Sequence, residues 1–115
     1  MLIYIVDDNS DLSEFIAFVL INAGYVVHVF ACPLEALGHM KNSSLCPAML
    51  ITDYNVPKMN GYELHQAVSK HAPMVKTIVT SGSYVPNLIG DLHFIHKPFA
   101  PEHLLKLIDV VKGNA

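Results

Sequence analysis

The sequence contains no tryptophan, only two cysteines and few charges, since Asp, Glu, Lys and Arg together make up 15% of its 115 residues. The formal net charge is -3, and the basic residues are scattered rather than clustered as on a nucleic-acid-binding surface. The longest apolar run in the interior, Phe15 to Ile21, is far shorter than a membrane span. We therefore expect neither direct binding to nucleic acid nor insertion into a membrane.

The chain also lacks the marks of a secreted protein. Cys32 and Cys46 suit a reducing compartment, although the sequence alone leaves a disulfide between them open. The apolar residues 1–6 have no basic segment before them, and Asp7 and Asp8 interrupt them at once, so they do not form a signal peptide. We expect a cytoplasmic protein.

Apolar residues are abundant, at 52% of the chain, which is enough to build one buried core. Hydrophobic patterns of strand and helix alternate along the sequence without a repeat or linker. We predict one domain over residues 1–115 with no effector domain. The predicted strands are 2–6, 25–30, 48–52, 76–80 and 93–95. The first predicted helix begins after Ser10 and ends before Gly24, the second runs from Pro33 to about Lys41, the third follows a loop at 54–61 and runs to about His71, and the last starts at Pro101.

The first helix shows how these boundaries are derived. Ser10 is suited to cap its N-terminus, and Gly24 stands where a glycine commonly ends a helix. Between them, apolar residues recur at helical spacing. Strands that alternate with helices in this way predict an α/β protein whose parallel sheet is covered on both faces.

In such a sheet, ligands bind beyond the carboxyl ends of the strands. Asp7 and Asp8 follow the first predicted strand, Asp53 the third, Ser81 the fourth and Lys97 the fifth. Three acids, one hydroxyl and one amine therefore meet at one edge of the sheet.

This set of residues suits phosphoryl transfer. Three clustered carboxylates need either raised pKa values or a bound cation, and Mg²⁺, or Mn²⁺ in its place, prefers such oxygen ligands. An aspartate such as Asp53 can accept a phosphoryl group covalently. Lys97 can neutralise a phosphoryl oxygen, and the Ser81 hydroxyl can donate a hydrogen bond to another.

Four short segments carry a resemblance to a known family. They are VDDN at 6–9, LITDYNVPKMNGYEL at 50–64, TSGS at 80–83 and FIHKPF at 94–99. In this order, and at strand ends, they resemble the receiver domains of two-component response regulators over almost the whole chain. The resemblance implies a flavodoxin-like, doubly wound sheet of five parallel strands in the order 2-1-3-4-5, with helices on both faces.

The resemblance also implies roles for individual residues. Asp53 matches the phosphoacceptor and a Mg²⁺ ligand, and Asp8 matches a second carboxylate ligand. Asn55 would bind the metal through its backbone carbonyl, and Asp7 through a water molecule. The phosphoryl donor would be a histidine kinase or a histidine phosphotransfer protein. Such a domain is not an enzyme acting on other substrates, because it catalyses only its own phosphorylation and dephosphorylation.

Three further residues match positions that bind the phosphoryl group or respond to it in this family. Ser81 corresponds to the switch hydroxyl, Lys97 to the phosphate-binding lysine, and Phe94 to the aromatic residue whose rotamer follows phosphorylation. The peptide between Lys97 and Pro98 is expected to be cis.

One segment departs from the family. Only 97 − 81 = 16 residues separate Ser81 from Lys97, fewer than receivers usually have, and Pro86 and Gly90 both oppose a regular helix there. We predict that the helix between the fourth and fifth strands is missing or reduced to a turn, and that Phe94 is then fixed rather than switching.

Taken singly, these residues have simpler explanations. Asp7 and Asp8 alone would be a solvated strand end, Ser81 a turn residue, Lys97 a surface lysine and Phe94 a core aromatic. It is their combination that favours the phosphorylation site.

The seven histidines do not suggest a structural zinc site, because none pairs with a cysteine at a zinc-ligand spacing. His93 and His96 are three apart on a strand and point to opposite faces. Two other functions remain open: a receiver-like protein-binding module that never switches, and a Mg²⁺-dependent phosphatase, for which no separate general base is visible.

Overall fold

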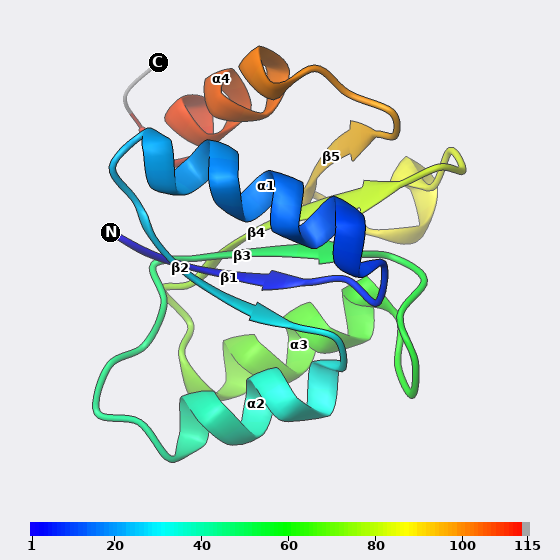
Figure 1. The fold of residues 1–115 in the computed structure, drawn as a ribbon. Coiled ribbons are helices and arrows are strands. Elements are labelled where there is room, and N and C mark those ends of the chain that lie inside the picture. Colours follow the sequence, from blue (N-terminus) through cyan, green and yellow to red (C-terminus); the bar gives the residue numbers. More distant parts are fainter. Residues whose placement is uncertain (114–115) are drawn as a thin grey trace.

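The computed structural model describes residues 1–113, in which strands and helices alternate as predicted (Figure 1). The strands are β1 (Leu2–Val6), β2 (Val26–Phe30), β3 (Met49–Asp53), β4 (Lys76–Ser81) and β5 (His93–His96). The helices are α1 (Ser10–Asn22), α2 (Pro33–Lys41), α3 (Gly61–His71) and α4 (Pro101–Val111). All strand pairs are parallel in the order β2-β1-β3-β4-β5, which confirms the predicted fold class.

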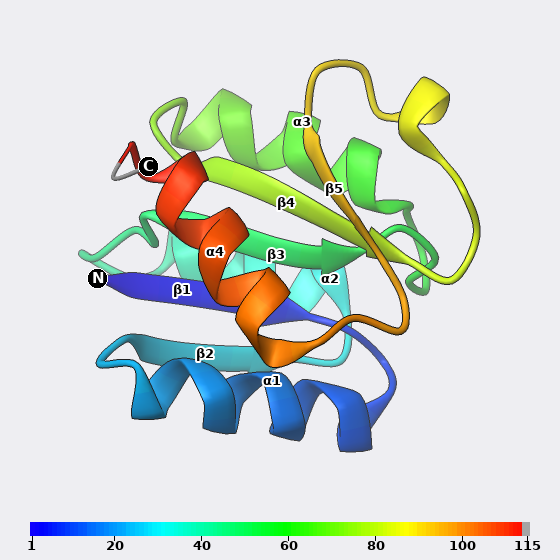
Figure 2. The ribbon, with the colours of Figure 1, turned by 90° about the horizontal axis from the view of Figure 1, so that it is seen from above.

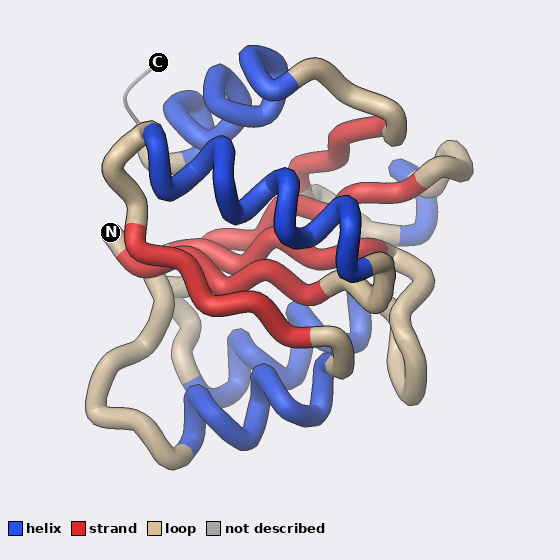
Figure 3. Tube along the Cα trace, in the orientation of Figure 1, coloured by secondary structure: helices blue, strands red, loops and turns tan. Residues whose placement is uncertain are grey.

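The sheet separates two layers of helices. Helices α1 and α4 cover one face, and α2 and α3 cover the other (Figures 1 and 3). Successive residues of β1 divide between these layers: Ile3 and Ile5 belong to the core under α1 and α4, while Tyr4 and Val6 belong to the core above α2 and α3. Because both faces are buried, β1 needs an unbroken apolar run rather than an alternating one.

Helix α1 begins differently from the prediction. The prediction that Ser10 caps it was wrong: Asn9 is the cap, because its side-chain oxygen accepts a hydrogen bond from the Leu12 N–H at 3.1 Å. Ser10 is the first helical residue. Asn and Ser are about equally good caps, so propensity could not decide between neighbours. Gly24 ends the helix region with a φ of +97°, as its position predicted.

The connection between β4 and β5 contains a single 3₁₀ turn, Pro86–Leu88, in the segment where the sequence predicts that a full helix is lost. Gly90 follows it with a φ of +59°. The prediction of a helix reduced to a turn is therefore confirmed. Buried Val85 and Ile89 pack with Val79 and so still cover this side of the sheet.

Parallel strands bring their carboxyl ends to the same edge of the molecule. Figure 2, which looks onto the α1 and α4 face, shows β1, β3 and β4 running side by side toward that edge. Within residues 1–113, no helix combines the length and the apolar character that a membrane span requires.

His65 on α3 gives the fold a predictable pH response. Its Nδ1 forms a 2.9 Å hydrogen bond with the hydroxyl of buried Thr77 on β4, and burial lowers the pKa of His65. The unfolded chain therefore takes up the proton at a higher pH than the folded chain does. The resulting stability is present above the unfolded pKa of about 6.5 and is lost as the pH falls toward the folded pKa.

We expect His65→Gln to reduce the loss of stability on acidification between about pH 8 and pH 5. Urea unfolding followed by circular dichroism at a series of pH values measures this slope. His71→Gln, at an exposed position on the same helix, is the matched control and should keep the wild-type slope. Identical slopes for His65→Gln and the wild type would contradict the assignment.

Candidate acidic site at the carboxyl edge

Asp7, Asp8 and Asp53 meet at the carboxyl edge of β1 and β3. The register pairs Val6 with Thr52, so the two strands end level and deliver their acids side by side. One carboxylate oxygen from each residue lies within 4.8 Å of the others. Asp7 is buried and Asp8 exposed, so the cluster is open to solvent on the side of Asp8.

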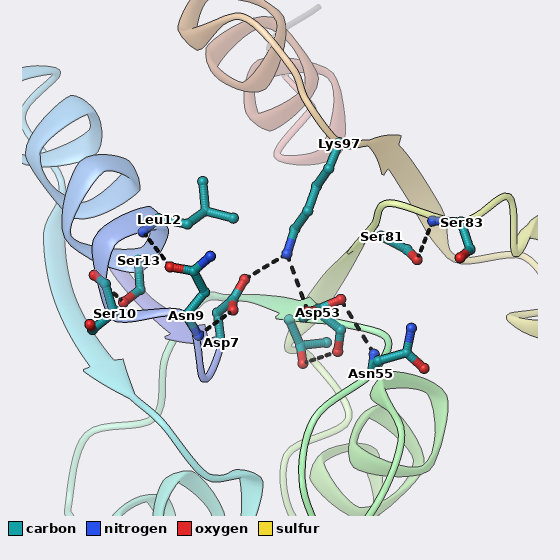
Figure 4. A network of polar contacts seen from close by, with 11 residues as sticks. Asp7, Asn9, Ser10, Leu12, Ser13, Asp53, Asn55, Ser81, Ser83 and Lys97 are labelled. Atoms are coloured by element: carbon teal, nitrogen blue, oxygen red, sulfur yellow. Dashed lines mark hydrogen bonds and ion pairs between the residues drawn. The ribbon is translucent and has the colours of Figure 1, made fainter.

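Lys97 reaches into this cluster from the end of β5. Its Nζ donates to Asp7 Oδ2 at 2.9 Å and to Asp53 Oδ2 at 3.2 Å (Figure 4). The Lys97 backbone N–H donates to the Ser81 carbonyl at 2.8 Å, which fixes the start of the side chain beside β4. The Lys97–Pro98 peptide is cis, as expected. One ammonium group thus joins Asp7, which follows β1, to Asp53, which ends β3.

The environment shifts the pKa values of Asp53 and Lys97. Burial raises the pKa of Asp53; Lys97 opposes this effect and the negative charge of Asp7 adds to it, leaving the pKa above its ordinary value. Burial alone would lower the pKa of Lys97, but its hydrogen bonds and ion pairs with Asp7 and Asp53 outweigh burial and raise it. Lys97 is therefore charged at neutral pH, and any further cation close to Asp53 would stabilise its ionised form.

The N-terminus of α3 lies against the backbone of Asp53. The Gly61 N–H donates to the Tyr54 carbonyl at 2.9 Å, and a Cβ at position 61 would lie 2.9 Å from the Asp53 carbonyl oxygen. Asn60 and Glu63 close the helix end with reciprocal side-chain to backbone hydrogen bonds of 2.8 and 2.9 Å. The asparagine–glycine pair therefore holds the helix and the acidic strand end in close contact.

Ser81 ends β4 next to this cluster. It is fully buried, and its Oγ accepts a hydrogen bond from the Ser83 N–H at 3.0 Å (Figure 4). Phe94 on β5 is only partly buried, and its ring packs edge-on against exposed Tyr84 with the centroids 6.1 Å apart. The aromatic ring thus rests on the shortened β4–β5 connection.

Most of the residues predicted from the sequence lie together. Asp7, Asp8, Asp53 and Lys97 form one cluster, and the Asn55 N–H donates to Asp53 Oδ1 at 3.3 Å. Phe94 takes no part in the polar contacts of the cluster, although its strand leads into Lys97.

One contributor to the site was not predicted. The Asn9 N–H donates to Asp7 Oδ1 at 2.9 Å, so the residue that caps α1 also orients the buried acid. In the loop between β3 and α3, exposed Lys58 has a φ of +78°, a conformation rare for a residue other than glycine. The preceding Pro57 is the sequence signal for this conformation, because proline favours the first central position of a turn whose next residue has a positive φ.

The donor set fits a hard divalent cation. All three side chains offer carboxylate oxygens, which are the ligands that Mg²⁺ prefers, and the open side leaves room for the waters that Mg²⁺ retains. Within residues 1–113, no nitrogen or sulfur ligand is part of the cluster.

Two curated relatives are similar to this chain in sequence. The chemotaxis protein CheY1 of Helicobacter pylori is 30% identical, over 99% of this chain and 98% of its own length. The C4-dicarboxylate transport transcriptional regulatory protein DctD of Rhizobium meliloti is also 30% identical over 90% of this chain, which spans only 24% of that longer protein.

Two solved structures agree with the sequence relatives. A CheY-like response regulator receiver domain protein from Methanospirillum hungatei superposes with a TM-score of 0.82 at 28% identity, covering 95% of this chain and 90% of the other. Chemotaxis protein CheY4 of Vibrio cholerae gives a TM-score of 0.84 at 27% identity, covering 96% and 97%. The family model of the response regulator receiver domain matches residues 3–109, and the chain therefore belongs to that family.

Proposed function

We propose that this chain is a cytoplasmic phosphoacceptor of a two-component signalling system, with Asp53 as the phosphorylated residue. The observation that carries the proposal is the placement of Asp53 within reach of both a cluster of acids and the Lys97 ammonium. A nucleophilic carboxylate, a fixed positive charge and a cation-binding acid pair are the parts that phosphoryl transfer requires. The donor is a phosphohistidine of a histidine kinase or a histidine phosphotransfer protein.

In the proposed reaction, an Asp53 oxygen forms a bond to phosphorus while the bond from phosphorus to the donor's histidine nitrogen breaks. That nitrogen keeps the electron pair of the broken bond. Lys97 keeps its hydrogen bond to Asp7 and transfers the one that it makes with Asp53 to a phosphoryl oxygen. The Ser81 hydroxyl turns from the Ser83 N–H and donates to a second phosphoryl oxygen.

A bound Mg²⁺ would supply the remaining positive charge for the phosphoryl oxygens. We assign its carboxylate ligands to Asp8 and Asp53, a backbone ligand to the Asn55 carbonyl, and an indirect contact through water to Asp7. Support comes from the clustering of the three carboxylates and from the raised pKa of Asp53, since both favour the uptake of a cation.

Incubation with acetyl phosphate and Mg²⁺, followed by intact-mass measurement, tests this proposal. We expect one phosphoryl adduct on the wild type, none in the presence of EDTA, and none on Asp53→Asn. Asp91→Asn, which removes an exposed carboxylate from the β4–β5 connection, is the matched control and should be modified like the wild type. An adduct on Asp53→Asn would refute the assignment of the acceptor. If the wild type accepts phosphate neither from acetyl phosphate nor from a phosphorylated kinase, the function itself is refuted.

One observation favours a second candidate, a receiver-like module that binds a partner without switching. The short β4–β5 connection packs against Phe94 through Tyr84 and leaves no full helix to rearrange. Backbone NMR spectra with and without beryllofluoride, a mimic of the phosphoryl group, distinguish the two candidates. Shifts that reach Phe94 and residues 83–92 support switching, whereas shifts confined to the acidic cluster support the static module.

A further inference from the structure

A second group of side chains of a type that can bind metals lies outside the acidic cluster, between the edge strand β2 and helix α2. His28 on β2 and His39 in the last turn of α2 are both exposed, and their ring centroids lie 5.1 Å apart. Helix α2 covers the face of the sheet beside the edge strand β2 (Figure 1). Two imidazoles from separate elements thus meet at the surface.

The buried neighbour Tyr4 holds both rings in place. Its hydroxyl forms a 2.7 Å hydrogen bond with His39 Nδ1, and its ring stacks on His28 with the centroids 5.9 Å apart. Tyr4 is only 2% exposed, so this support belongs to the core. Phe30 packs against His39 from another side, with a centroid distance of 5.5 Å.

The hydrogen bond between Tyr4 and His39 decides which His39 nitrogen is available. With Nδ1 engaged, Nε2 is the nitrogen that remains for a ligand at the surface. Metal-binding histidines commonly have this arrangement, in which the other ring nitrogen is held by an oxygen that orients the imidazole. The Tyr4 hydroxyl can accept a hydrogen bond from Nδ1–H in the liganded state.

We propose that His28 and His39 form a binding site for a divalent transition metal, Zn²⁺ in particular, with water completing its coordination. Imidazole nitrogens suit Zn²⁺, whereas Mg²⁺ prefers carboxylate oxygens such as those of the acidic cluster, so Mg²⁺ does not compete for the histidine pair. With only two protein ligands, the site is exchangeable rather than structural. Binding ties α2 to the sheet edge and stabilises the folded state by mass action.

Zinc titration with Mg²⁺ held at saturation tests the site, because the acidic cluster is then occupied. The Cys32→Ser/Cys46→Ser background removes the two free thiols, which would compete for Zn²⁺. Calorimetry should show one saturable Zn²⁺-binding site. NMR spectra should show that Zn²⁺ shifts the ring signals of His28 and His39. His28→Gln and His39→Gln should each weaken binding at least about tenfold, and Tyr4→Phe should do so by about ten- to a hundredfold.

The double variant His93→Gln/His96→Gln is the matched control, because it removes as many exposed imidazoles from the other edge strand. It should bind Zn²⁺ like the background protein. The proposal is overturned if Zn²⁺ does not saturate a site, if the ring shifts fall on other histidines, or if the control loses as much affinity as the His28 and His39 variants. The ring shifts are measured on the background protein and do not depend on whether a variant folds.

Discussion

Lys97→Met is expected to destabilise the protein by about 2 kcal/mol in the absence of divalent metal. The substitution keeps much of the apolar stem but removes the ammonium group that lies 2.9 Å from Asp7 and 3.2 Å from Asp53. Asp7 is 3% exposed, and among residues 1–113 it would then keep only the Asn9 N–H as a donor. The cost stays below that of a fully buried ion pair because the Lys97 side chain is 18% exposed.

The same substitution should make the protein more responsive to magnesium. A divalent cation between the acids replaces the lost positive charge, so Mg²⁺ should stabilise Lys97→Met more than it stabilises the wild type. Urea unfolding by circular dichroism, in EDTA and in excess Mg²⁺, measures both quantities. Lys106→Met, at an exposed position of α4, is the control and should change neither. Equal stabilisation of Lys97→Met and the wild type by Mg²⁺ would contradict the geometry.

Phosphorylation of Lys97→Met should slow about a hundredfold, because the substitution removes the fixed charge that we propose stabilises the phosphoryl group. Acetyl phosphate kinetics followed by intact mass provide the measurement. Since Mg²⁺ restores stability but not the ammonium group, the variant should be folded and slow. A folded variant that reacts at the wild-type rate would assign the role of Lys97 to stability alone.

The edge that carries these residues could be predicted from the sequence because it follows from strand polarity. Once the strands before Asp7, Asp53 and Lys97 are parallel, their ends must meet. Prolines and glycines in the β4–β5 connection likewise predicted the loss of a helix, since their effect is local. In both cases the prediction needs only the order of the strands or the backbone preferences of single residues.

Other features depend on distances that no pattern encodes. The shorter Lys97 contact, at 2.9 Å, is with Asp7 rather than with Asp53, at 3.2 Å, and no sequence pattern distinguishes the two acids in this respect. The His28–His39 pair requires the register of β2 and the rotation of α2 to be known together. Neighbouring caps such as Asn9 and Ser10 differ too little in propensity to be separated in advance.

Gly61 is another position at which a contact in the folded structure, rather than a sequence pattern, decides the effect of a substitution. Helix propensity alone predicts that Gly→Ala stabilises a helix by about 0.5–1 kcal/mol. At position 61, however, the new methyl group would lie 2.9 Å from the Asp53 carbonyl oxygen and 3.2 Å from the Tyr54 Cα. Both atoms belong to the backbone and cannot turn aside, so the helix must move.

We therefore expect Gly61→Ala to destabilise the protein by about 2 kcal/mol. At Gly38, in the interior of α2, a Cβ would meet no neighbouring atom within 4 Å, so Gly38→Ala should instead stabilise by about 0.5–1 kcal/mol. Urea unfolding of the two variants checks this opposite sign. Because the displaced helix contacts the backbone of Asp53, Gly61→Ala should also slow phosphorylation by acetyl phosphate, while Gly38→Ala should not. If both variants stabilise the protein alike, the close contact between α3 and the acidic strand end does not constrain the fold.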